Sequence, residues 1–356
     1  MEHLKNWTNF IEKYQNVLIK NEHDVYYLTK FHSTNMFILI IEGEKFVLTD
    51  QRYLEQARKK IPEFVLIDLG NKTQFQNVFK KLSGKTLYVS EDDFTIHAFK
   101  FFNSFFKKNK LNISVKAIGF PPFRIIKSKE EIADTKKAIA ITDDIFKEII
   151  NWIKPGLTEL DVYKKIMILT IESVANGESF LPIVAAGING ANPHWHSSNY
   201  VIKDSDMITI DMGVFYKQGC SDMTRTIMTG TPNCKQKQIF DLVNKSMELA
   251  IAQIKPGVTL ENIDKVARDF LKENGYGDDY FTHALGHGIG VDIHEPPTVS
   301  PNSKGIIEEG MIFTIEPGIY IPKELGCRLE QDILVTKKGH KVLNKSKVNL
   351  EIKDNC

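Results

Sequence analysis

Short apolar runs alternate with amphipathic segments through the first third of the chain. The runs MFILII at residues 36–41 and KTLYVS at 85–90 have the composition of strands, whereas QRYLEQARKK at 51–60 has helical character. This alternation is typical of an α/β domain. Since a membrane-spanning helix needs about 20 apolar residues, the short run MFILII predicts a buried strand.

A proline pair marks a change of pattern near residue 120. The segment AIGFPPFRIIKSKEE contains Pro121 and Pro122 and leads into a new helical pattern. The chain has 356 residues. Because single cores stop growing at roughly 250 to 300 residues, we expect two domains. We place them at residues 1–122 and 123–356.

A long amphipathic helix is predicted directly after this boundary. Ser128 as N-cap and Glu131 three positions later form the pattern of a capping box. Apolar residues then recur at helical spacing until the pattern stops at Pro155. This stripe, which indicates a core-facing helix, comprises Ile132, Ile139, Phe146, Ile149 and Ile153.

An internal repeat organises the second domain. The segment IKPGLTELDVYKKI at residues 153–166 recurs 101 residues later as IKPGVTLENIDKVA at 254–267. Each copy ends one helix at Pro-Gly and starts another at the threonine that follows. Two equivalent α+β halves are the simplest interpretation.

Composition and charge exclude several classes of partner. The chain is 42% hydrophobic and 26% charged, as expected of an ordinary globular protein. Its 46 Lys and Arg against 45 Asp and Glu give a net charge of +1, so no net basic field would recruit nucleic acid or an acidic membrane. The N-terminal segment and the cysteines bear on the compartment. The start MEHLKNWTNF lacks the apolar core of a secretory signal. Four cysteines without disulfide or metal spacing favour a cytoplasmic protein; they are Cys220, Cys234, Cys327 and Cys356.

Two acidic residues follow each copy of the repeat in a β-hairpin pattern. In MITIDMGVFYKQGCSDMTRTIMTG, a turn within residues 216–219 would bring Asp211 and Asp222 onto neighbouring strands at similar height. Burying two like charges costs several kcal/mol unless a counter-charge is present, and a divalent cation is a common remedy. Taken alone, the pair could also be two solvated aspartates at a hairpin mouth.

The second half supplies further oxygen and nitrogen ligands. Glu316 in FTIEPGIY and Glu330 in CRLEQDILV repeat the hairpin pattern. Between these hairpins and the first pair, HALGHGIGVDIHEPP presents His287 between glycines, with His294 seven residues further on. Four carboxylates and one imidazole suit two divalent cations, with manganese, cobalt or iron favoured over a sulfur-rich structural zinc site.

Two such cations would support hydrolysis. They would lie about 3.5 to 4 Å apart and activate a bridging water as the nucleophile. His294 would then polarise the substrate carbonyl or stabilise its oxyanion, and His194 in NGANPHWHSS would contact the other side of the scissile bond. His194 and His196 could equally be plain loop histidines.

At these residues the chain resembles the pita-bread metallopeptidases, which include Xaa-Pro aminopeptidases, prolidases, methionine aminopeptidases and the metal-free creatinases. IDMG with CSDMTRT, HALGHGIG with HEPP, IEPG and RLEQD stand in the family's order, and YLTKFHSTN with TDQRY is similar to its N-terminal domain. The resemblance implies an α+β protein with a creatinase-like α/β domain followed by a pseudo-symmetric pita-bread domain. It implies two divalent metal ions, most readily Mn2+ with Co2+, Fe2+ or Zn2+ as alternatives, on Asp211, Asp222, His287, Glu316 and Glu330.

The resemblance also implies roles for the surrounding side chains. Glu316 would double as general acid and base, His294 would contact the scissile carbonyl, and His194 would position the residue after the cut. Arg328 would orient a ligand carboxylate or meet a substrate group, unless it is a strand-surface arginine. The resemblance further implies a homodimer. It assigns no role to Trp195.

The expected activity follows from the domain content and one missing arginine. Methionine aminopeptidases usually lack the N-terminal domain, which leaves the two proline-directed types. Several prolidases bind the dipeptide's carboxylate with an arginine just after the HEP motif, whereas here the stretch reads HEPPTVSPNSK. We expect a Xaa-Pro aminopeptidase that removes the N-terminal residue from peptides with proline second, with a metal-bridging hydroxide as nucleophile. The alternatives are a prolidase, a non-catalytic binding protein of this fold and a hydrolase of small amides.

Overall fold

The apolar run at residues 36–41 is a buried strand inside a six-stranded sheet, in a computed structural model that describes residues 5–119, 123–349 and 351. The strands of this sheet are β1 (Asn16–Ile19), β2 (Met36–Ile41), β3 (Glu44–Thr49), β4 (Val65–Asp68), β5 (Thr86–Ser90) and β6 (Ser114–Ile118). Their order is β4-β3-β2-β1-β5-β6. The neighbours β1–β2 and β2–β3 are antiparallel and the other pairs are parallel. The predicted α/β domain is confirmed.

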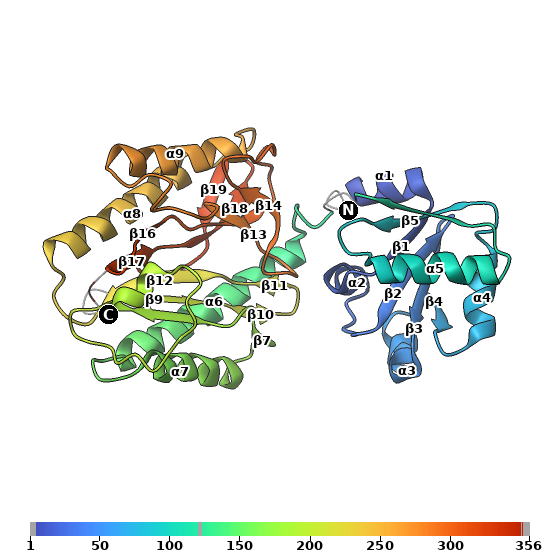
Figure 1. The fold of residues 1–356 in the computed structure, drawn as a ribbon, viewed down its shortest axis with the longest axis horizontal. Helices are drawn as coiled ribbons and strands as arrows, with labels where there is room; N and C mark the ends of the chain where they lie inside the picture. Colours follow the sequence, from blue (N-terminus) through green and yellow to red (C-terminus); the bar gives the residue numbers. More distant parts are fainter. Residues whose placement is uncertain (1–4, 120–122, 350, 352–356) are drawn as a thin grey trace. The chain divides into compact units, whose positions relative to one another are not determined.

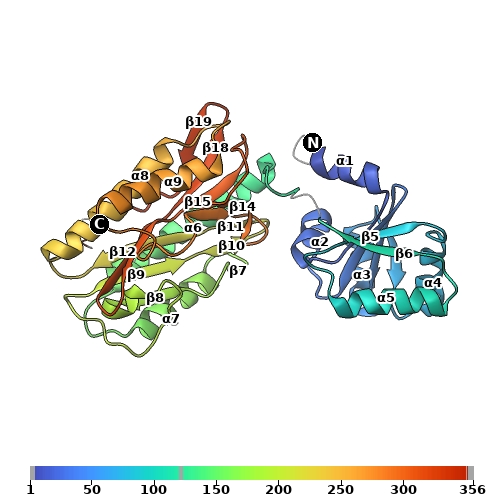
Figure 2. The same cartoon turned by 45° about the horizontal axis from the view of Figure 1, so that its top comes forward.

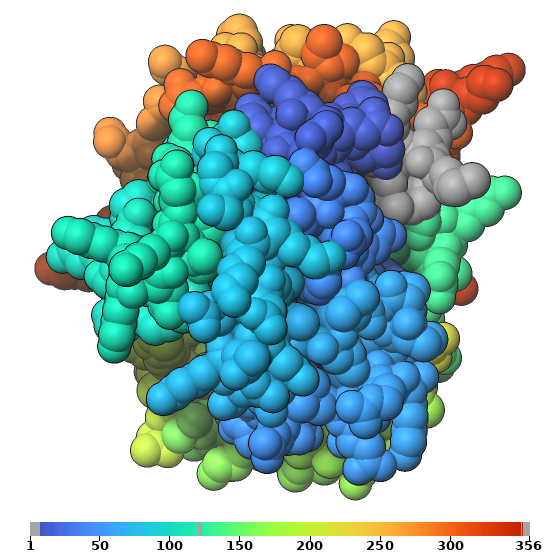
Figure 3. Space-filling view, turned by 90° about the vertical axis from the view of Figure 1, so that its right-hand side faces the viewer, coloured from blue at the N-terminus to red at the C-terminus, as the bar shows by residue number. Residues whose placement is uncertain are grey.

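In the part of the chain that the structure describes, five helices accompany this sheet. They are α1 (Lys5–Tyr14), α2 (Glu22–Thr29), α3 (Gln51–Lys60), α4 (Lys72–Lys80) and α5 (Ile96–Lys108). Of these, α4 and α5 pack on the sheet through an aromatic cluster. Phe79 of α4 stacks edgewise or tilted on Phe102 and Phe106 of α5, with ring centroids 5.6 and 5.2 Å apart. In Figure 3, segments from α3 to α5, coloured blue to turquoise, make up most of the visible face of this unit.

The chain divides into two units, Met1–Phe123 and Arg124–Cys356. The proline pair at which the sequence places the boundary, Pro121 and Pro122, lies outside the described residues. We therefore keep residues 1–122 and 123–356 as the proposed domain limits. Neither unit contains, within its described residues, a helix long and apolar enough to cross a membrane.

The first half of the second unit has two helices on one side of a three-stranded sheet. The helices are α6 (Lys129–Trp152) and α7 (Glu159–Glu172), and the sheet comprises β8 (Ile183–Ala186), β9 (Met207–Met212) and β12 (Met223–Met228). Next to it lie β7 (Gly177–Glu178), β10 (Val214–Tyr216), β11 (Gly219–Cys220) and the 3-10 turn η2 (Gly187–Ala191). The predicted capping box is confirmed, since Ser128 and Glu131 exchange hydrogen bonds of 2.9 and 3.2 Å. Phe146, Ile149 and Ile153 of the apolar stripe are buried against this sheet. Ile139, with the half-buried Ile132, packs instead in a smaller cluster that includes Ile289 and Ile312 of the second half.

The second half repeats the plan with a larger sheet. Its helices are α8 (Cys234–Ala252) and α9 (Leu260–Glu273). Its strands are β13 (Gly286–Gly288), β14 (Glu295–Val299), β15 (Ile312–Ile315), β18 (Gln331–Thr336) and β19 (Gly339–Val342), with the hairpin β16 (Gly318–Ile321) and β17 (Leu325–Arg328) beside them. Figures 1 and 2 show the pair α8–α9 on one side of the strands and α6–α7 on the other. Each helix pair has its own hydrophobic core.

The two copies of the repeat adopt the same backbone geometry. Gly156 and Gly257 both have φ of +92°, a conformation that glycine adopts without strain. Their N–H groups donate to the carbonyls of Ile202 and Ile307, at 2.9 Å in each case. The threonines that follow cap α7 and α9. The predicted pseudo-symmetry is thus present down to single hydrogen bonds.

Two glycines let the backbones of η2 and β17 touch. A Cβ on Gly326 would overlap the carbonyl of Gly190, and a Cβ on Gly190 would lie 3.3 Å from the nitrogen of Gly326. This contact holds the segment that precedes His194 against the strand that ends at Arg328.

Gly326→Ala should therefore destabilise the second unit. The added methyl group meets backbone, which cannot rotate away, and overpacking of this kind costs about 1 to 3 kcal/mol or more. Gly339→Ala is the matched control, since a Cβ at Gly339 meets nothing within 4 Å. Urea unfolding of both variants measures the difference. Equal midpoints would show that η2 and β17 are not held by this contact.

Candidate metal centre

The first carboxylate pair lies on the hairpin of β9 and β12. Asp211 pairs in register with Thr224, and Asp222 stands two residues before that partner, on the same face. Asp211 and Asp222 are therefore diagonal neighbours on the two strands, whereas the sequence predicts that they lie at similar height. Asp211 and Asp222 are only 9% and 5% exposed, so the alternative of two solvated aspartates is wrong.

The second carboxylate pair lies at one end of the β15–β18 ladder. Ile315 pairs with Gln331, so Glu316 and Glu330 lie just beyond this rung, Glu330 between β17 and β18 rather than within a strand. Glu330 also joins the two halves. Its N–H donates to the carbonyl of Thr224 at 3.1 Å, and the Thr224 hydroxyl donates to Glu330 Oε2 at 2.8 Å.

His287 on β13 completes the cluster. Its Nε2 lies 3.3 Å from Glu316 Oε1 and 3.5 Å from Asp222 Oδ2. Asp222, His287 and Glu330 each offer a ligand atom, and these atoms lie within 4.8 Å of one another. The neighbouring glycines are required by space, because a Cβ on Gly286 or Gly288 would overlap backbone of adjacent strands.

Burial and mutual repulsion dominate the electrostatics of the cluster. Burial, followed by the charges of Glu330 and Asp211, raises the pKa of Asp222 well above its usual value. Burial and the charges of Glu316 and Asp211 likewise raise the pKa of Glu330. Burial acts in the same direction on Glu316 and is the largest single influence there. The hydrogen bond with His287 and the charges of His287, His283 and Arg328 together outweigh it and lower the pKa of Glu316 to about 2.

This donor set fits divalent cations. Asp211 Oδ1 and Glu330 Oε1 are buried and accept no hydrogen bond from any described residue. Buried carboxylate oxygens without partners carry a large desolvation cost, which cation binding would offset. Four carboxylates and one imidazole are the oxygen-rich ligands that hard divalent cations prefer.

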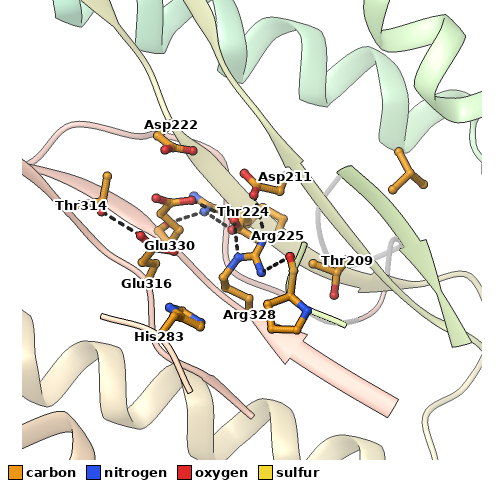
Figure 4. A network of polar contacts seen from close by, with 12 residues as sticks. Thr209, Asp211, Asp222, Thr224, Arg225, His283, Thr314, Glu316, Arg328 and Glu330 are labelled. Atoms are coloured by element: carbon orange, nitrogen blue, oxygen red, sulfur yellow. Dashed lines mark hydrogen bonds and ion pairs between the residues drawn. The ribbon is translucent and has the colours of Figure 1, made fainter. Parts of the chain in front are cut away.

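Arg328 supports the cluster through hydrogen bonds to Asp211 and Thr224. It is buried, which excludes the interpretation of a strand-surface arginine. Its Nη2 donates to Asp211 Oδ2 at 2.6 Å and its Nε to the hydroxyl of Thr224 at 3.1 Å (Figure 4). Its Nη1 donates to the hydroxyl of Tyr320 and the carbonyl of Pro193 at 3.0 and 3.1 Å. Arg328 thereby orients Asp211 and leaves the other oxygen of that carboxylate available.

Three supporting residues were missed by the sequence analysis. Thr224 alternates with Asp222 along one strand, so the period-two pattern could have identified it. Asp332 stands two residues after Glu330 and carries the same signal, whereas Tyr320 gave none. The hydroxyl of Tyr320 lies between Arg328 and His283. Asp332 accepts the N–H of Asp222 at 3.3 Å, and burial raises the pKa of Asp332 to about 7.

A cavity of about 790 Å³ opens onto the cluster. Asp211, Asp222, His287 and Glu316 line it, whereas Glu330 is buried outside the lining. The candidate substrate-binding residues His194 and His294 line it as well, as does His196, and the ring centroids of His294 and His287 are 4.3 Å apart. Burial, followed by the charge of His287, lowers the pKa of His294. An apolar wall faces these polar groups and comprises Leu160, Tyr163, Phe180, Leu181, Pro182 and Ile183.

Comparison with known proteins gives a family for each unit. Residues 133–337 match the model of metallopeptidase family M24. Residues 12–115 match that of the Creatinase/Prolidase N-terminal domain.

Individual relatives agree with these matches. The chain is 43% identical to the Xaa-Pro dipeptidase of Pyrococcus furiosus over 64% of its own length and 65% of the relative's. Its structure resembles that of Xaa-Pro dipeptidase from Bacillus anthracis, with a TM-score of 0.90, 33% identity and 99% of each chain covered. It also resembles X-Pro aminopeptidase from Thermotoga maritima, with a TM-score of 0.85, 31% identity and 95% and 97% of the two chains covered.

The family match spans more than half of the chain and includes both carboxylate hairpins. The solved structures extend the likeness to a creatinase-type domain followed by a pita-bread domain. The carboxylate and imidazole cluster lies inside the matched region, where a metallopeptidase needs its metal ligands. This chain therefore belongs to metallopeptidase family M24.

Proposed function

We propose that the chain is a two-metal Xaa-Pro aminopeptidase, which removes the N-terminal residue from peptides with proline at the second position. One observation carries the proposal. Four acidic residues and His287 converge at a cavity that histidines from two other segments, His194 and His294, also line. The proline preference is supported by the creatinase-type N-terminal domain and by relatives that are named Xaa-Pro peptidases.

The proposed metal ligands are Asp211, Asp222, His287, Glu316 and Glu330. When bound there, two divalent cations would supply an activated water and Lewis-acid polarisation of the substrate carbonyl. We propose manganese as the cation, because the donors are mainly carboxylate oxygens, with cobalt, iron and zinc as the alternatives.

The chain's own residues would handle the proton and the substrate. Glu316, hydrogen-bonded to His287, would accept a proton from the attacking water and deliver it to the leaving nitrogen. His294, whose ring lies next to that of His287, would donate a hydrogen bond to the scissile carbonyl oxygen. His194 would contact the residue that follows the cut.

The lining of the cavity supports an aminopeptidase. A dipeptide places its C-terminal carboxylate close to the scissile bond, and an arginine is well suited to bind it. Arg328 is the one arginine or lysine among the described residues of the lining, and four of its five N–H donors are committed to Asp211, Thr224, Tyr320 and Pro193. A longer peptide would carry its carboxylate away from the site.

A Xaa-Pro dipeptidase is the second candidate. It is favoured by the names of relatives at 43% and 33% identity. In that case another cation, such as Lys304 or one from the N-terminal domain of a second subunit, would bind the carboxylate.

We also propose a homodimer that acts in the cytoplasm. The dimer rests on family resemblance. The compartment is supported by the described cysteines, which are free thiols; of these, Cys220 and Cys327 are buried and Cys234 is exposed.

Asp222→Asn should abolish metal binding and peptidase activity while the protein stays folded. Loss of a ligand should lower turnover by more than the roughly 10- to 100-fold that follows loss of a residue behind the ligands. In chelator-treated protein the variant should melt no lower than wild type, because one of the mutually repelling buried charges is gone. Metal analysis, peptide hydrolysis and thermal melting give the three readouts.

Asp241→Asn on the exposed face of α8 is the matched control and should change none of these readouts. Full metal content and activity in Asp222→Asn would refute the proposed ligand set.

His294→Gln should lower kcat by about 100-fold, the usual loss when an oxyanion donor is removed. Metal content and KM should stay close to wild type, because His294 acts on the carbonyl in the transition state. Steady-state kinetics with parallel metal analysis provide the measurement. An effect confined to KM would mean that His294 only binds the substrate.

The substrate class is tested with Ala-Pro, Ala-Pro-Ala and Ala-Ala-Ala. Chelated protein is supplied with manganese, cobalt, iron or zinc one at a time, and released alanine is measured. We expect cleavage of Ala-Pro-Ala, with the highest rate in manganese. Cleavage of Ala-Pro alone would establish the dipeptidase, and cleavage of Ala-Ala-Ala alone would refute the proline preference.

A further inference from the structure

Glu159 is a buried carboxylate outside the proposed metal centre. It is fully buried in the first turn of α7. Its Oε1 accepts hydrogen bonds from the N–H of Ala186 at 2.8 Å and the side-chain amide of Asn189 at 3.0 Å. Its Oε2 accepts bonds from Trp195 Nε1 at 2.9 Å and from the N–H and hydroxyl of Ser198 at 2.9 and 2.7 Å. One side chain thus satisfies five donors.

Four of these five donors belong to the segment that carries His194. We call residues 187–199 the His194 loop; it consists of η2 and irregular backbone. Five consecutive lining residues of the cavity come from it, namely Pro193, His194, Trp195, His196 and Ser197. His194 itself is exposed, so its position depends on how the backbone on either side of it is held.

Two buried side chains hold the loop on opposite sides of His194. On the metal side, Arg328 donates to the carbonyl of Pro193, the preceding residue. On the other side, Glu159 binds Trp195, the following residue, and Ser198 beyond it. The first anchor also touches the proposed ligand Asp211, so the position of the loop is set relative to the metal centre.

The internal repeat shows that the fold itself does not need a carboxylate at this position. At the offset of 101 residues, the counterpart of Glu159 is Leu260. Leu260 likewise begins a helix after a capping threonine and is 2% exposed. Its N–H donates to the carbonyl of Gly305, as the N–H of Glu159 donates to the carbonyl of Tyr200. The same backbone place is therefore occupied by an ordinary core residue in the half that has no His194 loop.

We propose that Glu159 is a positioning residue that fixes the His194 loop for substrate binding. The inference deepens the proposed function and rests on it for the role of His194. It assigns to Glu159 no contact with substrate or metal. Its effect passes through Trp195 and Ser198 to the residue between the two anchors.

The expected effect of replacing Glu159 follows from its acceptor capacity. A glutamine has one acceptor oxygen and a donor NH2 group, so either the Ala186 and Asn189 donors or the Trp195 and Ser198 donors would face an N–H. Buried donors without acceptors are costly. Because the loop lies at the surface, it can open locally and give these donors to water, while the two cores stay packed.

The first test measures the environment of Trp195 in the His194 loop by fluorescence and does not depend on peptidase activity. In a background where Trp7 and Trp152 are replaced by phenylalanine, Trp195 is the sole tryptophan. Glu159→Gln should shift its emission to longer wavelength and raise its quenching by acrylamide at least about twofold. Glu159→Leu, which copies position 260, should enlarge both changes. The matched control Glu131→Gln alters another buried glutamate in the first turn of a helix and should change neither.

The second test measures how the replacement of Glu159 changes the kinetics of peptide hydrolysis. With Ala-Pro-Ala, Glu159→Gln should lower kcat/KM by about 10- to 100-fold, the scale of a misplaced binding group. Most of the loss should lie in KM, and metal content should be unchanged. In a His194→Ala background the same change should cost less than about threefold, because residues that act through one another are not additive.

The outcomes separate this inference from the proposed function. Unchanged Trp195 emission and KM in Glu159→Gln would overturn the inference and leave the peptidase intact. A shift of Trp195 emission that comes with loss of metal and of cooperative melting would also overturn it, since Glu159 would then be merely structural. If the wild type cuts no peptide, the proposed function fails, and the emission of Trp195 still decides whether Glu159 anchors the loop.

Discussion

Repulsion among buried carboxylates is the constraint on which this structure depends. Asp222 and Glu330 are buried beside two further acidic residues, and their pKa values rise in response to burial and to the charges of neighbouring carboxylates. A chain folded without a counter-charge would hold this cluster at a cost that ordinary core packing must offset. Binding of a divalent cation at this cluster would therefore be thermodynamically linked to folding. The buried arginine behind Asp211 compensates only part of the negative charge.

Pseudo-symmetry explains how such a cluster is assembled. Each half brings two acidic residues on a hairpin, and Glu330 and Thr224 join the hairpins through a reciprocal pair of hydrogen bonds. The halves then diverge where they meet the cavity. The first half contributes the His194 loop and the second contributes His287 and His294. Equivalent backbones thus carry different chemistry on the two sides of one cavity.

Local patterns in the sequence predict most of the frame. Ser128 with Glu131 predicts the start of α6, and the repeated Pro-Gly-x-Thr predicts two turns of identical conformation. Alternation along β9 predicts that Asp211 faces the same side as its neighbours two residues away. These signals act over a few residues, which is why they can be read from one sequence. Arg328 and Glu159 show the limit, because Arg328 binds Asp211 from 117 residues away and Glu159 binds donors 27 to 39 residues away. When segments far apart in the sequence bury a charged residue, the sequence around that residue shows no periodic pattern that would predict it.

The backbone contact between Gly190 and Gly326 restricts how the cavity can be redesigned. A loop taken from another protein could not be transplanted into positions 187–199 as an independent module. It would have to bring a glycine to face β17, and it would have to offer donors that match Glu159. The wall of residues 180–183 makes neither of these connections. Variation in peptide preference is therefore more accessible to engineering through that wall than through the loop.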